Sequence, residues 1–153
     1  MLDETDHQIL KLLQQDARLS VERVAQKVGL SPTPVRRRIR KLEEAGIILG
    51  YGAVVDPEAA GMSLSLYVFI KLESRSREVI EAFESRIRTL QEIETCNLVT
   101  GSHDYMLFMH VRDMKHYDHY VHEILSDIPG IFEIQTSIVI SRIKVGHAAV
   151  RQA

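Results

Sequence analysis

Between Ser20 and Gly46 the apolar positions follow two short helical repeats separated by a turn. The first repeat has the i, i+3, i+4, i+7 spacing of one helix face, and its members are Val21, Val24, Ala25 and Val28. Ser20 is a favourable N-cap, and Gly29 ends this helix because glycine enters the left-handed conformation at little cost. The second repeat begins with Ser31 as N-cap and Pro32 at the first helical position. The spacing predicts a helix-turn-helix, and the buried stripe of its second helix is Val35, Ile39 and Leu42.

The chain on either side of this unit has different patterns. Before it, acidic and apolar positions predict a helix that begins at Asp3 or Asp6 and ends at about Asp16. After it, the β-branched residues and glycines of IILGYGAVVD indicate a strand or wing that leaves the helical domain. An Asp-Pro pair then predicts a turn. The resulting domains are residues 1–60 and 61–153.

From Met62 onward the hydrophobic positions alternate, as in strands that bury one face. The pattern predicts a strand from Met62, a helix over about 76–90, strands over 94–100 and 105–111, a helix from Asp113 to Pro129 and a strand over 131–143. This β-α-β-β-α-β order is that of the ferredoxin-like fold, in which both helices pack on one face of an antiparallel sheet. The predicted fold class is α+β, with an N-terminal winged helix-turn-helix and a C-terminal ferredoxin-like domain.

Two helices leave the other face of that sheet uncovered. Tyr67, Phe69 and the run YMLFMHV at 105–111 cannot all point toward the helices, so we expect an apolar open face. Exposed apolar patches usually mark association surfaces. We therefore predict a homodimer that forms through these sheets.

Cationic side chains are concentrated on the second helix of the helix-turn-helix, because five of the six residues from Arg36 to Lys41 are Arg or Lys. At about 100° per residue, the side away from the apolar stripe carries Thr33, Arg37, Arg40 and Lys41, flanked by Arg36 and Arg38. Such a helix fits the DNA major groove, with Thr33, Arg36, Arg37 and Arg40 in the groove and Arg38 and Lys41 nearer phosphates. The predicted DNA-binding set is Ser31, Thr33, Arg36, Arg37, Arg38, Arg40 and Lys41. The alternative is an ordinary solvated basic face.

The composition favours a local basic patch over a generally basic domain. The 153 residues are 45% hydrophobic with a formal net charge of −2, and the first 60 residues carry nine basic and nine acidic side chains. Binding should therefore depend on a few aimed contacts. A single cysteine excludes an internal disulfide, and no signal-like or membrane-length apolar segment is present. These features lead us to expect a soluble, cytoplasmic protein with no membrane partner.

Other polar residues have simpler interpretations. His116, His119 and His122 lie at i, i+3, i+6, a spacing that drifts about 120° around a helix. Solvated histidines explain them better than a metal site, and we expect neither a metal nor a cofactor. Cys96 is expected in the core, and Arg75 is expected to be a solvated side chain.

Four motifs carry a resemblance to a known family that covers essentially the whole chain: LDETDHQILKLLQQDARLS, LSPTPVRRRIRKLEEAGII, GYGAVVDPEAAG and the Gly101-x-x-Asp104-Tyr105 turn. Together they resemble the Lrp/AsnC family of bacterial and archaeal transcription regulators. The resemblance implies a sequence-specific regulator that dimerises through its C-terminal sheets and often assembles four dimers into an octamer that wraps DNA. It also implies a small effector, usually an amino acid, bound between dimers. A two-fold dimer implies a palindromic operator on double-stranded DNA.

In this family the effector site is built around the turn, so the resemblance implies effector contacts by Thr100, Gly101, Ser102, His103, Asp104 and Tyr105. A glycine turn exposes N–H groups to a carboxylate, and an aspartate can meet an α-ammonium group. A simple hairpin turn would have the same composition. Thr136 is a further candidate, because a polar residue in an apolar strand needs a partner or solvent.

Two other functions compete with that of a regulator. Some haem-pathway decarboxylases resemble this two-domain architecture, but the sequence has no Ser/His/Asp, Walker or Rossmann motif. We therefore do not expect an enzyme. A metabolite-binding module with an incidental DNA role is the third possibility, and failure to bind any DNA would favour it.

Overall fold

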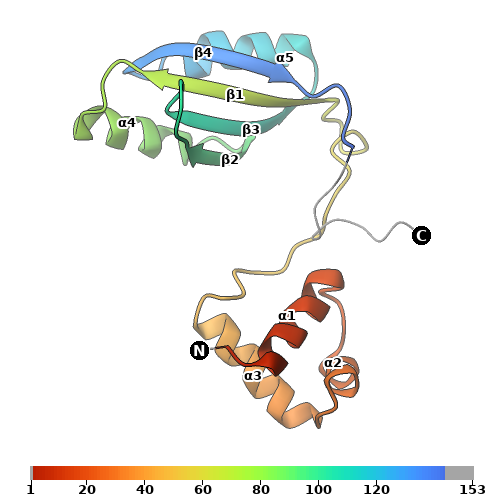
Figure 1. The fold of residues 1–153 in the computed structure, drawn as a ribbon. Coiled ribbons are helices and arrows are strands. Elements are labelled where there is room, and N and C mark those ends of the chain that lie inside the picture. Colours follow the sequence, from red (N-terminus) through yellow and green to blue (C-terminus); the bar gives the residue numbers. More distant parts are fainter. Residues whose placement is uncertain (1, 144–153) are drawn as a thin grey trace. The chain divides into compact units, whose positions relative to one another are not determined.

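A computed structural model describes residues 2–143 of the chain, which divide into two compact units (Figure 1). One unit contains the residues up to Val54, and the other is Val55–Arg142, so the division lies a few residues before the expected boundary at 60 and 61. Within the described residues, no helix has the length and apolar character needed to cross a membrane.

Three helices form the N-terminal unit, and their bounds are Glu4–Gln15 for α1, Val21–Val28 for α2 and Pro32–Glu44 for α3. Asp3 caps α1 in a reciprocal capping box with Asp6. At the start of α2 the Ser20 side chain accepts a hydrogen bond from the Arg23 N–H. Gly29 has a φ of 70° and ends α2, so the turn before α3 has the glycine it requires. The helix-turn-helix prediction is confirmed.

A single apolar cluster packs these helices together. All three helices contribute to its buried members, which are Ile9, Val24, Ala25, Val35 and Leu42. Burying one large aliphatic side chain contributes about 1.5–3 kcal/mol. The apolar stripe of α3 therefore decides which side of that helix faces inward, and its cationic residues lie elsewhere on the helix.

Residues 47–63 connect the two units without forming a strand, so a strand in IILGYGAVVD, one of the two forms expected there, is wrong for the described chain. A strand needs a neighbour that pairs with its N–H and C=O groups, and no described residue supplies one here. Leu49 and Val55 are exposed as a result. The turn expected at the Asp-Pro pair is present, because the Met62 N–H donates to the Pro57 carbonyl at 2.7 Å.

The C-terminal unit contains a four-stranded antiparallel sheet in the order β2-β3-β1-β4. The strand bounds are Leu64–Leu72 for β1, Ile93–Leu98 for β2, Tyr105–Val111 for β3 and Ile131–Ile138 for β4. Helix α4, Arg77–Ile87, follows β1, and helix α5, Met114–His119, follows β3 (Figure 1). The predicted α+β class and β-α-β-β-α-β order are confirmed.

Alternation along β1 separates the two faces of the sheet. Leu66, Val68 and Ile70 are fully buried against residues of both helical segments, and this core also contains Phe83, Ile87, Leu107, Met109, Tyr120 and Leu125. Tyr67 and Phe69 point to the other face, where the Tyr67 ring lies 4.8 Å from that of Phe108. Both helices thus cover one face, and aromatic residues lie on the open one.

The helix expected from Asp113 to Pro129 is not a single α-helix. Helix α5 ends at His119, and Tyr120–Leu125 continue as a π-helix. The α-helical period predicts a buried stripe of Met114, Tyr117, Val121, Ile124 and Leu125 for this segment, but Met114 is 53% exposed and Tyr120, which lies outside that stripe, is fully buried. The wider turn places Tyr120 and Leu125, five residues apart, together in the core.

Two expectations about strands also differ from the structure. Strand β4 ends at Ile138 rather than Ile143; the Val139 N–H still donates to the Ser65 carbonyl at 2.9 Å, but Ile140 is already 99% exposed. Cys96 lies exposed on β2 rather than in the core, because β2 is an edge strand.

Candidate DNA-binding and effector sites

The side of α3 away from the apolar cluster presents residues that we call the outward arc, namely Thr33, Arg36, Arg37, Arg40 and Lys41. Arg37 and Lys41 are exposed and make no ion pair with any residue in the described range 2–143. Arg36 and Arg40 pair with glutamates at 3.6 and 2.7 Å, and all four of these side chains are more than half exposed. Exposed pairs are worth about 0–1 kcal/mol, so both arginines are free to exchange their glutamates for phosphates or bases.

Ser31 is the N-cap of α3 by position, but its side chain makes no capping hydrogen bond. Pro32 and Pro34 occupy the first and third helical positions and carry no N–H, so the N3 donor of an ordinary serine cap is absent. Ser31 and Thr33 are both exposed. Their hydroxyl groups are therefore accessible to a bound partner.

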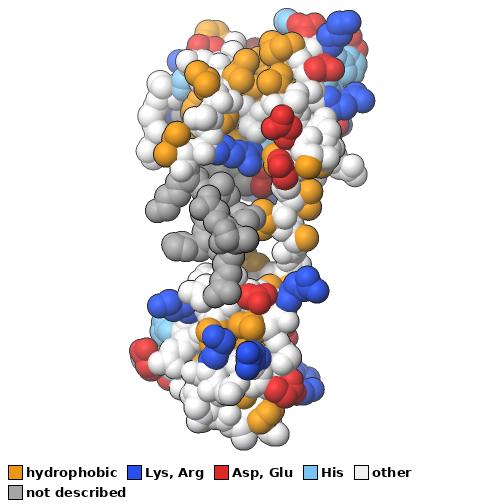
Figure 2. Space-filling view, turned by 90° about the vertical axis from the view of Figure 1, so that its right-hand side faces the viewer, with side chains coloured by type: hydrophobic (Ala, Val, Ile, Leu, Met, Phe, Trp, Pro, Cys, Tyr) orange, Lys and Arg blue, Asp and Glu red, His pale blue; other side chains and the backbone are white. Residues whose placement is uncertain are grey.

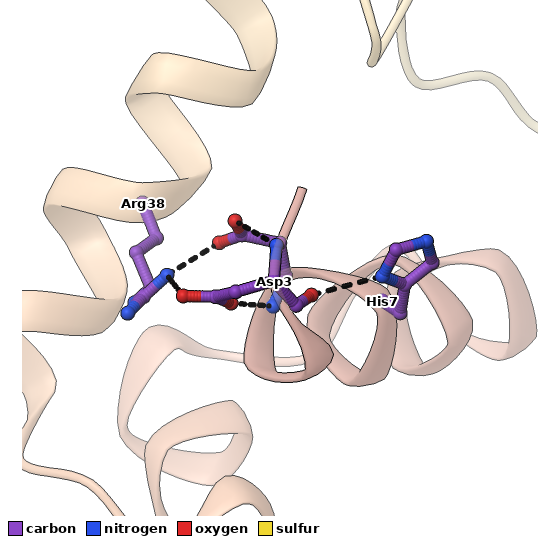
Figure 3. Close-up of polar contacts among 4 residues, drawn as sticks. Asp3, His7 and Arg38 are labelled. Atoms are coloured by element: carbon purple, nitrogen blue, oxygen red, sulfur yellow. Dashed lines mark hydrogen bonds and ion pairs between the residues drawn. The ribbon is translucent and has the colours of Figure 1, made fainter. Parts of the chain in front are cut away.

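Arg38 lies outside the outward arc. Its Nη1 atom lies 2.7 Å from Asp3 Oδ2 and 2.8 Å from Asp6 Oδ1, and its side chain is 31% exposed (Figure 3). The pKa of the Asp3 carboxyl is lowered, first by the Asp6 N–H and then by Arg38. The guanidinium thus has two acidic partners within the domain, whereas the sequence pattern places Arg38 near a DNA phosphate.

The turn between β2 and β3 forms one wall of a cavity of about 450 Å³. Four of the predicted effector residues line it: Thr100, Gly101, Asp104 and Tyr105. Gly101 has a φ of 122°, a conformation that favours glycine. The remaining lining residues come from β1, the segment before α4, α4 itself and the end of β2, and they are Leu72, Arg75, Ile80, Leu98 and Val99. Sequence reasoning missed these residues, because no local pattern links such distant segments to the turn.

Asp104 fastens the turn to the end of β1. It is 5% exposed, and its carboxylate accepts hydrogen bonds from the Leu72 N–H at 2.9 Å and from Arg75 Nε at 2.8 Å. Its own N–H donates to the Ile70 carbonyl at 2.8 Å. The Leu72 N–H, and after it Arg75, lower the pKa of the Asp104 carboxyl against the opposing effect of burial. A ligand ammonium group would have to share a carboxylate that is already hydrogen-bonded, and Arg75 is a partner of this carboxylate rather than a merely solvated residue.

Tyr105 forms the inner wall of the cavity. Only 2% of it is exposed, its hydroxyl donates to Glu84 at 2.9 Å, and its ring lies 4.6 Å from that of Phe83. Burial and then the neighbouring Glu84 raise the pKa of Tyr105 to about 12. The hydroxyl therefore remains protonated at neutral pH and is already hydrogen-bonded.

Three predicted effector residues do not line the cavity. Ser102 Oγ lies 3.0 Å from His103 Nδ1, and the His103 ring lies 5.5 Å from that of Phe69 on the open face. Thr136 pairs with Val68 from β4, on the opposite side of β1 from β3. Its hydroxyl is buried without a hydrogen-bond partner among the described residues. The structure brings four of the seven predicted residues together and leaves these three apart.

Comparisons with known proteins match both parts of the chain. A family model described as winged helix-turn-helix DNA-binding matches residues 2–48, and one described as Lrp/AsnC ligand binding domain matches residues 65–148. The chain belongs to the Lrp/AsnC family. It is accordingly a transcription regulator with a DNA-binding and a ligand-binding domain, and it is not an enzyme.

Relatives of this Lrp/AsnC protein match over nearly their full lengths. The leucine-responsive regulatory protein of Klebsiella pneumoniae is 39% identical over 97% of this chain and 91% of its own. Among solved structures, a transcriptional regulator from Neisseria meningitidis in complex with L-Met has a TM-score of 0.90 and 32% identity, and covers 98% of this chain and 97% of its own. Escherichia coli AsnC has a TM-score of 0.86 and 25% identity over 95% of this chain and 97% of its own.

The histidines of α5 and the π-helix lie near acidic side chains. His119 pairs with Glu123 at 3.1 Å and His122 with Asp118 at 3.5 Å, each more than half exposed. No group of three or more His, Cys, Asp or Glu side chains suited to a metal ion occurs in the part of the chain that the structure describes. These histidines are best explained as solvated side chains.

The substitution Asp104→Asn tests whether the turn depends on the carboxylate. The amide oxygen still accepts the Leu72 N–H, but no charge faces Arg75, so we expect the unfolding free energy of the C-terminal unit to fall by about 1–3 kcal/mol at neutral pH. The difference should shrink in acid. A carboxyl with a lowered pKa contributes stability above its unfolded value, near 3.8, and loses it as the pH falls through the folded value.

Denaturant unfolding of the wild type and of Asp104→Asn, followed by circular dichroism from neutral pH into acid, measures the difference in unfolding free energy. Arg75→Gln is the matched control, because it removes the same charge pair from the other side. If Asp104→Asn matched the wild type at neutral pH, the carboxylate would not hold the turn.

Proposed function

We propose that this Lrp/AsnC protein regulates transcription in the cytoplasm by placing α3 in the major groove of an operator and by responding to an amino acid. The outward arc carries the first part of this proposal. Arg37 and Lys41 project from a helix whose other side is buried, and no described residue neutralises them. Cationic side chains are visible on the helical unit in Figure 2.

Each residue of the arc has a role in this proposal. Thr33, Arg36, Arg37 and Arg40 contact base edges, because bidentate arginine to guanine is a discriminating contact. Lys41 neutralises a phosphate. Ser31, at the start of α3, lies beside the sugar-phosphate backbone of the DNA. Two symmetry-related copies of α3 would read a palindromic site on double-stranded DNA.

Removing an arc cation should weaken operator binding. We expect Arg37→Ala to cost about 1–3 kcal/mol if the contact is to a base. Enrichment of DNA from a random library with the full chain identifies the site, and fluorescence anisotropy then measures affinity. Arg40→Ala should weaken binding likewise, and Arg77→Ala is its matched control, because Arg77 is an exposed arginine of α4 that pairs, as Arg40 does, with a glutamate four residues later at 2.7 Å.

Unchanged affinity in both Arg37→Ala and Arg40→Ala would show that neither arginine contributes to recognition of the operator. Failure to enrich any site, with a folded protein, would reject DNA binding by the arc and would favour a metabolite-binding module.

We propose further that the cavity beside Asp104 binds an amino acid with an apolar side chain. The apolar side chains that line the cavity suit such a ligand, and they are Leu72, Ile80, Leu98 and Val99. The Gly101 backbone and the Arg75 guanidinium are the groups suited to its carboxylate. The L-Met complex of the Neisseria meningitidis regulator supports an amino acid as the effector class.

Apolar amino acids should raise the melting temperature of the full chain more than acidic or basic ones, because only the former fit this lining. Scanning fluorimetry with each of the twenty amino acids, followed by operator binding with those that shift it, measures the response. Leu98→Asp should abolish the shift while leaving the fold intact, since Leu98 is 72% exposed at the cavity wall.

Met114→Asp is the control, because Met114 is exposed in the same unit and does not line the cavity. Equal shifts in Leu98→Asp and wild type would locate the effector elsewhere, and no shift with any amino acid would contradict this effector class.

We also propose a homodimer that forms through the open face of the sheet, with further assembly of four dimers into an octamer. The apolar centre of this face is Tyr67, Phe69, Met106 and Phe108. Polar groups surround it: His110 lies 3.0 Å from Ser65 Oγ and 3.1 Å from Glu94, and Arg142 lies over the Phe108 ring. An apolar centre with a polar rim is typical of protein interfaces. Hydrophobic side chains gather on the C-terminal unit in Figure 2.

Phe108→Asp should dissociate this dimer, because it places a charge in the centre of the apolar patch while leaving the core on the other face intact. Size-exclusion chromatography with light scattering measures the mass of the variant, the wild type and the control Met114→Asp. A wild-type monomer at micromolar concentration would contradict the dimer, and a wild-type mass of eight chains would support the octamer.

A further inference from the structure

An ion-pair cluster joins the middle of α3 to the first turn of α1. The Asp6 N–H donates to Asp3 Oδ1 at 2.9 Å, and the Asp3 N–H donates to Asp6 Oδ2 at 3.2 Å. The other oxygen of each carboxylate accepts a hydrogen bond from Arg38 Nη1, at 2.7 and 2.8 Å. Every oxygen of the two carboxylates therefore has a partner within the domain. Figure 3 shows the Arg38 side chain extending from α3 to this turn.

The position of Arg38 on the helix explains why it reaches α1. At about 100° per residue, Arg38 lies about 60° from Val35 and 40° from Leu42, both of which are buried. Arg37 and Lys41 lie on the outward arc instead. Arg38 is thus on the border of the apolar stripe, and its 31% exposure contrasts with 78% for Arg40.

We propose that Arg38 is a positioning residue, which fixes how α3 is presented to DNA by anchoring it to Asp3 and Asp6, and that it does not neutralise a phosphate. This inference rests on the proposed function of α3 in DNA binding. It assigns the two aspartates a role in recognition although neither reaches DNA. They hold the helix that carries the arc. A tilted helix misaligns its side chains with base edges while its long cationic side chains still reach phosphates.

If Arg38 instead bound a phosphate, variants of Asp3 and Asp6 would change the affinity for DNA in the opposite direction. If Arg38 left the cluster to bind a phosphate, Asp3 and Asp6 would compete with DNA for it. Removing their charges would then strengthen binding. If Arg38 positions α3, removing them weakens specific binding. The direction of the effect of neutral variants at Asp3 and Asp6 therefore decides between the two roles.

The variants Asp3→Asn, Asp6→Asn and Arg38→Met test this in the full chain. Asparagine remains a good N-cap, but its single acceptor oxygen cannot serve both the capping box and Arg38. Lys41→Met is the control on the outward arc, because Lys41 is the exposed cation of α3 that the proposed function places at a phosphate. Affinity is measured at several salt concentrations for a duplex that carries the enriched site and for a random-sequence duplex.

We expect each of the three cluster variants to weaken binding to the enriched site by roughly tenfold, within the range seen for coupled residues. The double variant Arg38→Met with Asp6→Asn should be no weaker than Arg38→Met alone. Binding to the random duplex and the slope of log K against log[salt] should stay at wild-type values. In Lys41→Met that slope should fall by about 0.9 for each phosphate that the variant no longer neutralises.

Tighter binding by Asp3→Asn or Asp6→Asn, or a reduced salt slope in Arg38→Met, would overturn the inference, as would wild-type affinity in all three variants. If Arg38→Met fails to fold, as circular dichroism would reveal, the two asparagine variants still decide by the direction of their effect. Equal weakening on both duplexes would identify a general loss of folding and would also overturn a positioning role. If the wild type binds neither duplex, it is the proposed function that fails.

Discussion

Strand β1 is the element on which the C-terminal unit depends, because it pairs along both of its edges. Its alternate residues from Leu66 to Leu72 lie in the core, and Tyr67 and Phe69 lie on the open face. The same strand supplies the Ile70 carbonyl and the Leu72 N–H that bind Asp104. A shift of one residue in register would exchange the two faces. It would also remove the attachment of the turn, so one pairing determines the core, the open face and the cavity together.

In the helical unit the corresponding constraint is the apolar stripe of α3. Residues 1–60 contain equal numbers of acidic and basic side chains, so their total charge gives no basic surface. The packing of α3 sorts the charges by angle around the helix. Arg38, beside the stripe, is neutralised by two aspartates of α1, and Arg37 and Lys41 project away from the core. A locally basic surface on a neutral domain is therefore a consequence of helix geometry.

Local signals in the sequence are enough to place most elements. The cap at Ser20, the glycine at Gly29 and the alternation of β1 depend on residues close in the chain, and each appears where the sequence predicts it. Prediction fails where structure depends on a neighbouring segment. The β-branched stretch after α3 has no pairing partner among residues 2–143, and the last strand ends at Ile138, five residues before its predicted end. The π-helix changes the spacing of buried positions, which an α-helical period cannot anticipate.

In the candidate sites, too, features that depend on nearby residues can be predicted from the sequence, and features that depend on distant segments cannot. The composition of the turn is enough to locate one wall of the cavity, but Leu72 and Ile80 come from other segments and only the fold brings them there. Likewise, helical angles alone place Arg38 at the edge of the basic face. They cannot show that the first turn of α1 neutralises it, because that depends on the packing of α1 against α3.

The position of the cavity limits how an effector can act. Strand β3 alternates between the two faces, with Tyr105 at the cavity and Met106 and Phe108 on the open side. A ligand in the cavity therefore does not compete directly with a dimer partner on the open face. It changes DNA binding only if it binds one conformation or assembly more tightly than another. Because Asp104 already fixes the turn through its side chain and its N–H, moving the turn would break several hydrogen bonds. A ligand that leaves the turn in place keeps all of these bonds, so the less costly response of this fold is one in which the turn does not move.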